Sequence, residues 1–350
     1  MRITLAVLAA FGSVTCAPAA PKPQAATYVW WEAENPKATD FPKTNSFDPA
    51  NEKEAAVLSG GKWIGASDQR DHALFLEYDI EVPATANYGF YARKFWKHGP
   101  YRWRFDGGPW TEVREFALLD DAYMRKFLGA NWTAAGMVQL TKGKHSVRIE
   151  LLENQGAANF DAFVLTSTYF DARGKLKPDE KVGVAPAGWF AFEPSADPFK
   201  PSALDLRSLN EKFAGENGFI QAKGEEFVHG KSGKAVRFWA MNTGHDILDL
   251  DDLSLAYYAR SLAKQGVNLV RLHGGPWGED FRKVPPKNGQ KIARFVEALK
   301  KEGIYTALSI YFPLWLNFDE KSGFPGYEGG KHPFSLLYFN PEFQRIYRSW

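Results

Sequence analysis

The segment GVNLVRLHG (266–274) is an apolar run that ends in Arg271 and His273. It repeats the pattern of RFWAMNTG (237–244), where a hydrophobic run ends in Asn242 and two further small or polar residues. Near-continuous apolar runs of this length are typical of strands that are covered on both faces of a sheet. The sequence therefore predicts two buried strands whose carboxyl ends carry groups able to bind a polar ligand.

Two helical patterns alternate with these strands. Residues 251–266 and 289–303 each have an apolar stripe with the period of an α-helix, and IYTALSIYF (304–312) is a third apolar strand. The order strand–helix–strand–helix–strand predicts a parallel sheet covered by helices. A further helix is expected to begin in NPEFQRIYRSW (340–350), with Asn340 as its N-cap.

The side chains that follow the three strands form the predicted substrate-binding set: Asn242, Arg271, His273, Trp277 and Trp315. In parallel α/β folds, ligands bind at the carboxyl ends of the strands. Amide, guanidinium and imidazole groups can hydrogen-bond hydroxyl groups, and indole rings can cover the apolar face of a sugar. We therefore expect a neutral carbohydrate ligand here. The alternative is that Arg271 pairs with a structural carboxylate and that the tryptophans belong to the core.

The three strand segments resemble strands 1–3 of the retaining glycoside hydrolases with a (β/α)8 barrel, the cellulase-like clan. GFIQAKGEEFVHGKSG (218–233) resembles the hairpin that closes the barrel floor in many members. The resemblance implies that Arg271 orients the active-site carboxylates and that Asn242 and His273 contact substrate. It also implies a double displacement by two glutamates, at the ends of strands 4 and 7.

No residue of the sequence is assigned to catalysis. Asn-Glu pairs of the implied kind occur at 51–52 and 210–211, but both precede the first barrel strand and are interpreted as chance surface pairs. A complete barrel needs about 250 residues, and 116 residues run from Ala235 to Trp350. We therefore expect an incomplete barrel that is inactive alone, with both catalytic glutamates beyond Trp350.

Residues 28–168 have the pattern of an all-β domain. ALFLEYDIEV (73–82) and HSVRIELL (145–152) alternate apolar and polar residues, and NFDAFVLTS (159–167) is a third strand. Short strands separated by turn signals predict a β-sandwich. A proline-rich connector follows at 169–203, in which the aromatic segment GWFAFEP (188–194) is expected to pack against a neighbouring domain.

A calcium site is predicted in the sandwich. YVWWEAENP (28–36) places Glu32 and Glu34 on one strand face, and a late strand carries Asp161. Three carboxylates brought together suit Ca²⁺, which takes oxygen ligands. This pattern resembles carbohydrate-binding modules with a galactose-binding-like jelly roll, and the resemblance implies that the three residues hold a structural calcium. The alternative is an exposed acidic strand face.

The stretch FYARKFWKHGPYRWRFDGGPW (90–110) concentrates aromatic and basic residues around a Gly-Pro turn. Trp96 and His98 lie nearest this turn and are the predicted carbohydrate ligands of the sandwich. Interleaved basic and aromatic residues also fit single-stranded nucleic acid. A net charge of +2 and the predicted export both argue against nucleic acid as a partner.

The first 20 residues are predicted to be a secretory signal peptide. Arg2 precedes an apolar stretch that is too short to cross a bilayer, and Ala17-Pro18-Ala19 fits a cleavage site. The expected location is secreted or periplasmic. Lipid anchoring through Cys16, the only cysteine, is the alternative, against which the preceding threonine argues. No other segment is long and apolar enough to span a membrane.

The predicted fold is thus multidomain, with a jelly-roll sandwich (28–168), the connector (169–203) and the first part of a barrel (204–350). The predicted function is that of an exported glycoside hydrolase acting on polysaccharide or oligosaccharide, without a catalytic cofactor. One alternative is a non-catalytic, secreted carbohydrate-binding protein with a degenerate barrel. A third possibility is a cell-surface adhesive protein.

Overall fold

The computed structural model describes residues 28–350 except 68, 96, 317 and 330–332. The predicted signal peptide with Cys16, and also Trp96, therefore lie outside the described residues. No helix within the described residues is long and apolar enough to cross a membrane.

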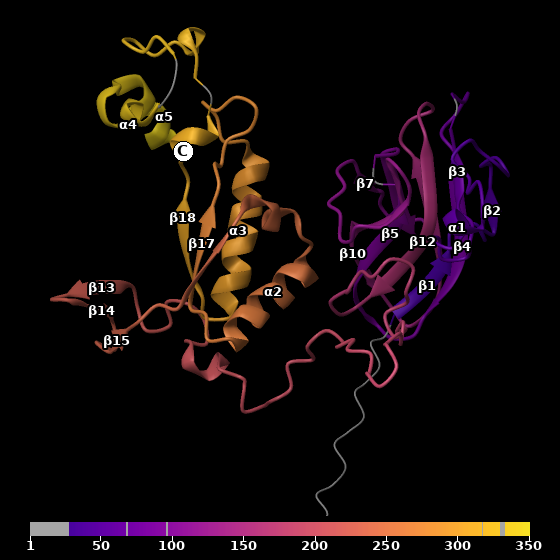
Figure 1. Ribbon diagram of the computed structural model, residues 1–350, viewed down its shortest axis with the longest axis horizontal. Helices are drawn as coiled ribbons and strands as arrows, with labels where there is room; N and C mark the ends of the chain where they lie inside the picture. The colour runs from indigo at the N-terminus through magenta and orange to yellow at the C-terminus, as the bar shows by residue number, and fades with distance from the viewer. Residues whose placement is uncertain (1–27, 68, 96, 317, 330–332) are drawn as a thin grey trace, which may run out of the picture.

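Residues 28–166 contain two five-stranded antiparallel sheets, so the predicted β-sandwich is confirmed (Figure 1). The first sheet has the order β1-β12-β5-β10, and β3 also pairs with β12. The second has the order β2-β4-β11-β6-β7. The strands of the first sheet are β1 (Tyr28–Glu32), β3 (Ile64–Ala66), β5 (Ala86–Lys94), β10 (Asn131–Leu140) and β12 (Ala158–Thr166). Those of the second are β2 (Ala38–Thr39), β4 (Phe75–Val82), β6 (Tyr101–Phe105), β7 (Thr111–Val113) and β11 (Gly143–Leu151). The short helix α1 (Glu52–Ala55) and a hairpin of β8 (Tyr123–Arg125) and β9 (Leu128–Gly129) lie in the connections.

The sandwich core lies between the two sheets. The alternating apolar residues of β4 from Leu76 to Val82 are buried as predicted, while Asp79 and Glu81 are exposed. Every residue of β12 is buried, because this strand lies inside its sheet and both of its faces are covered. Trp31, Phe90 and Phe163 stack on one another at centroid distances of 5.5–5.9 Å, which adds aromatic contact energy to the burial.

The connector holds its aromatic segment away from the rest of the chain. Trp189 is 77% exposed, and Phe190 and Phe192 are exposed to a similar degree, so the expected packing of this segment is wrong. The Glu193 carboxylate accepts the backbone N–H groups of residues 182 and 183 at 3.1 and 3.0 Å. This closes residues 182–193 into a loop of their own and turns the aromatic side chains to solvent.

The remaining residues form two small sheets and the predicted helices (Figure 1). An antiparallel sheet contains β13 (Ile220–Lys223), β14 (Glu226–His229) and β15 (Ala235–Val236). The parallel strands are β16 (Ala240–Thr243), β17 (Leu269–His273) and β18 (Tyr305–Ser309), joined through α2 (Asp252–Lys264) and α3 (Pro286–Lys301). The chain also has short 3-10 helices, η1 (Arg207–Leu209), η2 (His245–Asp249), η3 (Pro313–Trp315) and η4 (Glu320–Ser322), and ends in α4 (Phe334–Phe339) and α5 (Pro341–Ser349).

The predicted order of parallel strands and helices is therefore present. The assignment of these elements to a (β/α)8 barrel stays a prediction. Asp251 caps α2 by accepting two backbone N–H groups, and Asn340 caps α5 as expected. The helix stripes pack against Val270 and Leu272 of β17, which are buried.

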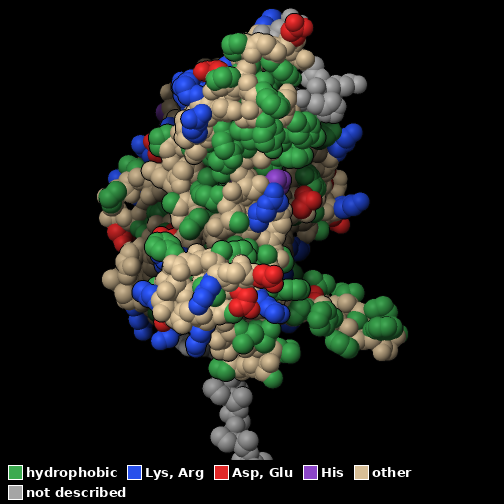
Figure 2. Space-filling model, turned by 90° about the vertical axis from the view of Figure 1, so that its left-hand side faces the viewer, with side chains coloured by type: hydrophobic (Ala, Val, Ile, Leu, Met, Phe, Trp, Pro, Cys, Tyr) green, Lys and Arg blue, Asp and Glu red, His purple; other side chains and the backbone are tan. Residues whose placement is uncertain are grey.

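The prediction that the first strand is covered on both faces is wrong. In β16 the first three residues are exposed, and the preceding Trp239 is 68% exposed. Helices α2 and α3 lie on the same side of the parallel sheet (Figure 1), and within the described residues the opposite face, which includes Asn242 and Arg271, stays open to solvent. Figure 2 views the molecule from that side and shows hydrophobic side chains gathered on the surface.

Candidate functional site

Three neighbouring strands bring polar side chains together at the carboxyl edge of the parallel sheet. Asn242 of β16 is in register with Arg271 of β17, and His273 is in register with Ser309 of β18. The Arg271 guanidinium donates to Asn242 Oδ1 at 2.9 Å and to Ser309 Oγ at 2.8 Å. His273 Nδ1 lies 2.9 Å from the same Ser309 hydroxyl. These four residues, called here the strand-end network, form one hydrogen-bonded row across the sheet.

Arg271 has no carboxylate partner within the described residues. Both of its hydrogen-bond acceptors are neutral, and among the described residues no carboxylate lies within 4.0 Å of its guanidinium. The alternative of a structural ion pair is therefore not found in this part of the chain. The side chain is exposed, so its remaining N–H donors can reach a ligand.

The two predicted tryptophans continue this row. The Trp315 ring lies 4.5 Å from the His273 ring and 6.4 Å from the Trp277 ring, centroid to centroid. Trp277 in turn lies 4.4 Å from Trp350. All these indoles are only half-buried, so they are not part of a closed core. The structure thus brings together all five predicted substrate-binding residues.

Ser309 is the member of the network that sequence reasoning missed. It ends the third apolar strand, in register with His273, and this position is the signal that could have found it. His245 lies beside the network, because a Cβ atom on Gly274 would come within 2.2 Å of its ring. Burial lowers the pKa of His245, the nearby His273 lowers it further, and Asp249 and Asp246 oppose the change.

The three predicted calcium ligands also come together. Ser59 links two of them, because its N–H donates to Asp161 Oδ1 at 3.0 Å and its hydroxyl to Glu32 Oε1 at 2.9 Å. Glu34 follows β1 in a turn. Burial raises the pKa of Glu34 to about 7, and the charges of Glu32 and Asp161 raise it as well. The alternative of an exposed acidic strand face is therefore wrong, since Asp161 is fully buried.

Of the three predicted calcium ligands, the two glutamates have the carboxylate oxygens best suited to bind Ca²⁺. Glu32 Oε2 and Glu34 Oε2 are buried without a hydrogen-bond partner, and such oxygens are the ligands that Ca²⁺ takes. Asp161 is already engaged, since Arg93 donates to its Oδ2 at 2.5 Å and both side chains are fully buried. Among the described residues no group of three His, Cys, Asp or Glu side chains is arranged to hold a metal ion. Calcium here stays a prediction.

His98 is held by its surroundings in the sandwich. Its ring packs edge-on against Phe47 and Phe95, at centroid distances of 4.7 and 4.3 Å. Asn159 Nδ2 lies 2.8 Å from His98 Nδ1. An amide nitrogen can only donate, so Nδ1 accepts and the ring proton is on Nε2. Burial, with Lys94 nearby, lowers the pKa of His98 to about 4. Nε2–H is then the group left for a ligand, and this role stays a prediction.

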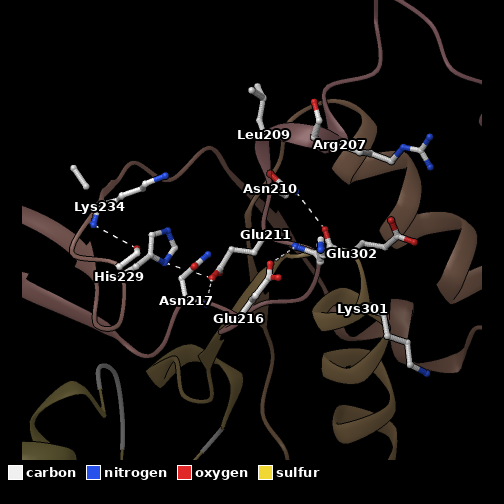
Figure 3. Close-up of a pocket in the computed structure, with 14 residues that line it drawn as sticks. Arg207, Leu209, Asn210, Glu211, Glu216, Asn217, His229, Lys234, Lys301 and Glu302 are labelled. Atoms are coloured by element: carbon white, nitrogen blue, oxygen red, sulfur yellow. Dashed lines mark hydrogen bonds and ion pairs between the residues drawn. The ribbon is translucent and has the colours of Figure 1, made fainter.

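A polar pocket of about 650 Å³ lies at the amino end of the strands, away from the strand-end network (Figure 3). It corrects the interpretation of Glu211 as part of a chance surface pair, because that side chain is only 7% exposed. The Glu211 carboxylate accepts the Tyr305 hydroxyl at 2.6 Å and the N–H of Asn217 at 2.7 Å. It therefore fastens the segment before β13 to the start of β18, which is a structural role.

The solved structures that resemble this chain include carbohydrate-binding modules, in agreement with its β-sandwich. A family 35 carbohydrate binding module from Clostridium thermocellum is 15% identical, covers 40% of this chain and 98% of its own, and has a TM-score of 0.28. A carbohydrate binding module of a Cellvibrio mixtus lichenase in complex with cellotriose is 17% identical, with 40% and 97% covered and a TM-score of 0.27. An exo-beta-1,3-galactanase from Phanerochaete chrysosporium with galactose is 17% identical, with 40% and 29% covered and a TM-score of 0.27. No family model and no curated protein matches the chain.

Proposed function

We propose that this chain binds carbohydrate at the carboxyl edge of its parallel sheet, as the substrate-binding part of an exported glycoside hydrolase. The observation that carries the proposal is the strand-end network together with Trp277 and Trp315. It presents amide, guanidinium, imidazole and hydroxyl groups in one row, next to half-buried indole rings. A sugar ring needs both kinds of contact, because its hydroxyl groups are polar and its C–H faces are apolar.

The hydrogen bond between Arg271 and Asn242 supports a direction for one of these contacts. Asn242 Oδ1 accepts from Arg271, so the Asn242 amide nitrogen is the group that donates to a sugar oxygen. In the finer proposal, hydrolysis with retention, a pair of glutamates acts as acid/base and nucleophile. Arg271 would then position these carboxylates, and its lack of a carboxylate partner within the described residues supports this role.

A second candidate is a carbohydrate-binding protein without catalysis. The lack of a carboxylate partner of Arg271 is compatible with this candidate too. The described part of the site has groups that bind a sugar but no pair of carboxylates. Release of sugars with retained anomeric configuration from a bound glycan, followed by NMR, would favour the hydrolase. Because this chain is expected to be inactive alone, binding without release is the result expected from both candidates.

The binding proposal is tested with isothermal titration calorimetry against cello-, xylo- and laminari-oligosaccharides. We expect Trp315→Ala and Arg271→Met each to weaken binding at least about tenfold, which corresponds to about 1.4 kcal/mol. Trp189→Ala is the matched control, since Trp189 is an exposed tryptophan in the connector, and it should leave the affinity unchanged. Equal affinities for all four proteins, or no binding to any of the three series, would refute the proposal.

A further inference from the structure

Ser309 joins two side chains of the strand-end network, Arg271 and His273. The Ser309 hydroxyl oxygen lies 2.8 Å from Nη2 of Arg271 and 2.9 Å from Nδ1 of His273. Arg271 and His273 are two residues apart on β17, and Ser309 of β18 is in register with His273. Side chains at such positions lie on one face of a sheet, so a single hydroxyl group contacts both.

The direction of the hydrogen bond from Arg271 follows from its chemistry. A guanidinium has only N–H donors, so Ser309 Oγ accepts this bond. A hydroxyl group has one proton and two lone pairs, and the bond from Arg271 uses one lone pair. The contact with His273 therefore uses either the hydroxyl proton or the second lone pair.

These two arrangements place the ring proton of His273 on different nitrogens. If Ser309 donates to Nδ1, the proton of the neutral ring is on Nε2. If Nδ1–H donates to Ser309, the hydroxyl proton has no acceptor, because within the described part of the chain this hydroxyl has no third hydrogen bond. In the first arrangement the Arg271 cation also polarises the hydroxyl and strengthens its donation to His273. The hydrogen bonds therefore favour the ring proton on Nε2.

The side chains of the network then offer donors to a ligand. His273 Nε2–H has no hydrogen-bond partner among the residues that the structure describes, and the ring is only half-buried. Asn242 Oδ1 accepts from Arg271, so the Asn242 amide nitrogen is the group left over, and it can only donate. The remaining N–H groups of Arg271 are donors as well. A ligand that contacts these three side chains has to supply acceptor atoms.

We propose that Ser309 is a positioning residue, which holds the ring proton of His273 on Nε2 and so makes the network present hydrogen-bond donors to the ligand. The proposal rests on the proposed function and adds a requirement for the sugar. The part of the sugar that meets the network has to supply acceptor oxygens, from hydroxyl groups, ring oxygens or carboxylates. A group that only donates, such as the ammonium of an amino sugar, would be rejected, and its charge would also repel that of Arg271.

The first test needs no ligand. Nitrogen NMR of the full chain with isotope-labelled histidine, at about pH 8, where an ordinary imidazole is neutral, shows which ring nitrogen carries the proton. His273→Gln identifies the signals of His273 by their loss. We expect the wild type to carry the proton on Nε2 alone and Ser309→Ala to give a mixture of the two tautomers. Ser309→Thr, which keeps the hydroxyl group, should restore the single tautomer.

The control is Ser232→Ala, because Ser232 is an exposed serine in the turn after β14, where its hydroxyl accepts the backbone N–H of Lys234. This variant should leave the signals of His273 unchanged.

The second test measures binding by calorimetry with cello-, xylo- and laminari-oligosaccharides. Ser309→Ala should raise the Kd at least about threefold, the effect expected when one hydrogen bond is lost, and Ser309→Thr should keep the wild-type value. In the NMR spectrum, a saturating oligosaccharide should slow the exchange of the His273 Nε2 proton with water, because that proton donates to a sugar oxygen.

A proton on Nδ1 in the wild type, or a Ser309→Ala spectrum with the proton still on Nε2 alone, would overturn the inference and leave the proposed function intact. Mixed tautomers in Ser309→Thr would overturn it as well. No binding to any oligosaccharide would refute the proposed function, and the spectra without ligand would still decide the role of Ser309. If Ser309→Ala does not fold, Ser309→Cys, whose thiol is a weaker donor, takes its place.

Discussion

Replacing Arg93 with Met should strongly destabilise the sandwich. The Arg93 guanidinium and the Asp161 carboxylate are both fully buried, and the shortest contact between them is 2.5 Å. In the variant, Asp161 would keep only the backbone N–H of Ser59 as a donor. Removing one partner of a buried ion pair typically costs about 3–5 kcal/mol, because it leaves an uncompensated charge. This is a large part of the 5–15 kcal/mol by which domains are usually stable.

The pH dependence makes this prediction specific. Burial raises the pKa of Asp161 to about 6, and Arg93 opposes that rise. An acid whose pKa is higher in the folded than in the unfolded state binds more protons when folded, so stability falls as the pH rises between the two values. Without Arg93 the folded pKa of Asp161 rises further. The loss caused by Arg93→Met should therefore be largest at pH 7 and smaller at pH 5, where Asp161 is protonated.

Urea unfolding at pH 7 and pH 5, followed by tryptophan fluorescence and far-ultraviolet circular dichroism, measures both effects through the midpoint of the sandwich transition. Arg102→Met is the matched control, because Arg102 is partly exposed and its partner Glu150 keeps a second arginine, Arg148. It should cost less than about 1 kcal/mol. A similar loss in both variants, or a loss for Arg93→Met that is the same at the two pH values, would refute the reasoning.

Three further changes test other parts of the structure. Burial lowers the pKa of His145, but hydrogen bonds to Asp106 and to a backbone carbonyl outweigh burial and raise the pKa above its usual value. The stabilisation by His145 should therefore be fully present below about pH 6.5 and be lost as the pH rises through the higher folded pKa. His145→Gln should flatten this pH profile in thermal denaturation. Millimolar Ca²⁺ should raise the melting temperature of the sandwich, and Glu34→Gln should abolish the increase. Because the pKa of Glu34 is about 7, protonation should weaken the calcium effect below that pH. Gly274→Ala would place a Cβ 2.2 Å from His245, so it should reduce oligosaccharide affinity in calorimetry and cost about 1–3 kcal/mol in urea unfolding.

The sequence predicted a helix well where its apolar residues recurred with the helical period and a capping residue stood at its start. Helix α2 has both, since its apolar stripe is buried and Asp251 caps it. Helix α4 has neither, because no side chain caps it and its sequence, FSLLYF, is almost wholly apolar. The exposure of β16 could not be predicted, since an apolar run shows that a strand can be covered on both faces but not which segment covers it.

The contacts at the sites that could not be predicted are those between residues far apart in the sequence. The rule that ligands meet the carboxyl ends of parallel strands predicted Asn242, Arg271 and His273 as one set, and the structure joins them in one hydrogen-bonded row. The pairing of Arg93 with Asp161 was not predictable, because it joins strands 68 residues apart and depends on their register. The role of Glu211 was hidden for the same reason, since its hydroxyl donor, Tyr305, is 94 residues away.

Arg93 and Arg271 show how the structure separates a buried, ion-paired arginine from an exposed one without a carboxylate partner. Both arginines follow an apolar or aromatic run within a strand, so the sequence pattern treats them alike. Arg93 is fully buried and has a carboxylate partner, and its charge is therefore balanced inside the fold. Arg271 is exposed and bonds only to neutral groups, so its charge is available to an external or catalytic carboxylate. The charge of the hydrogen-bond partners and the exposure of the arginine, rather than its sequence context, therefore support the proposal that Arg271 belongs to a binding site.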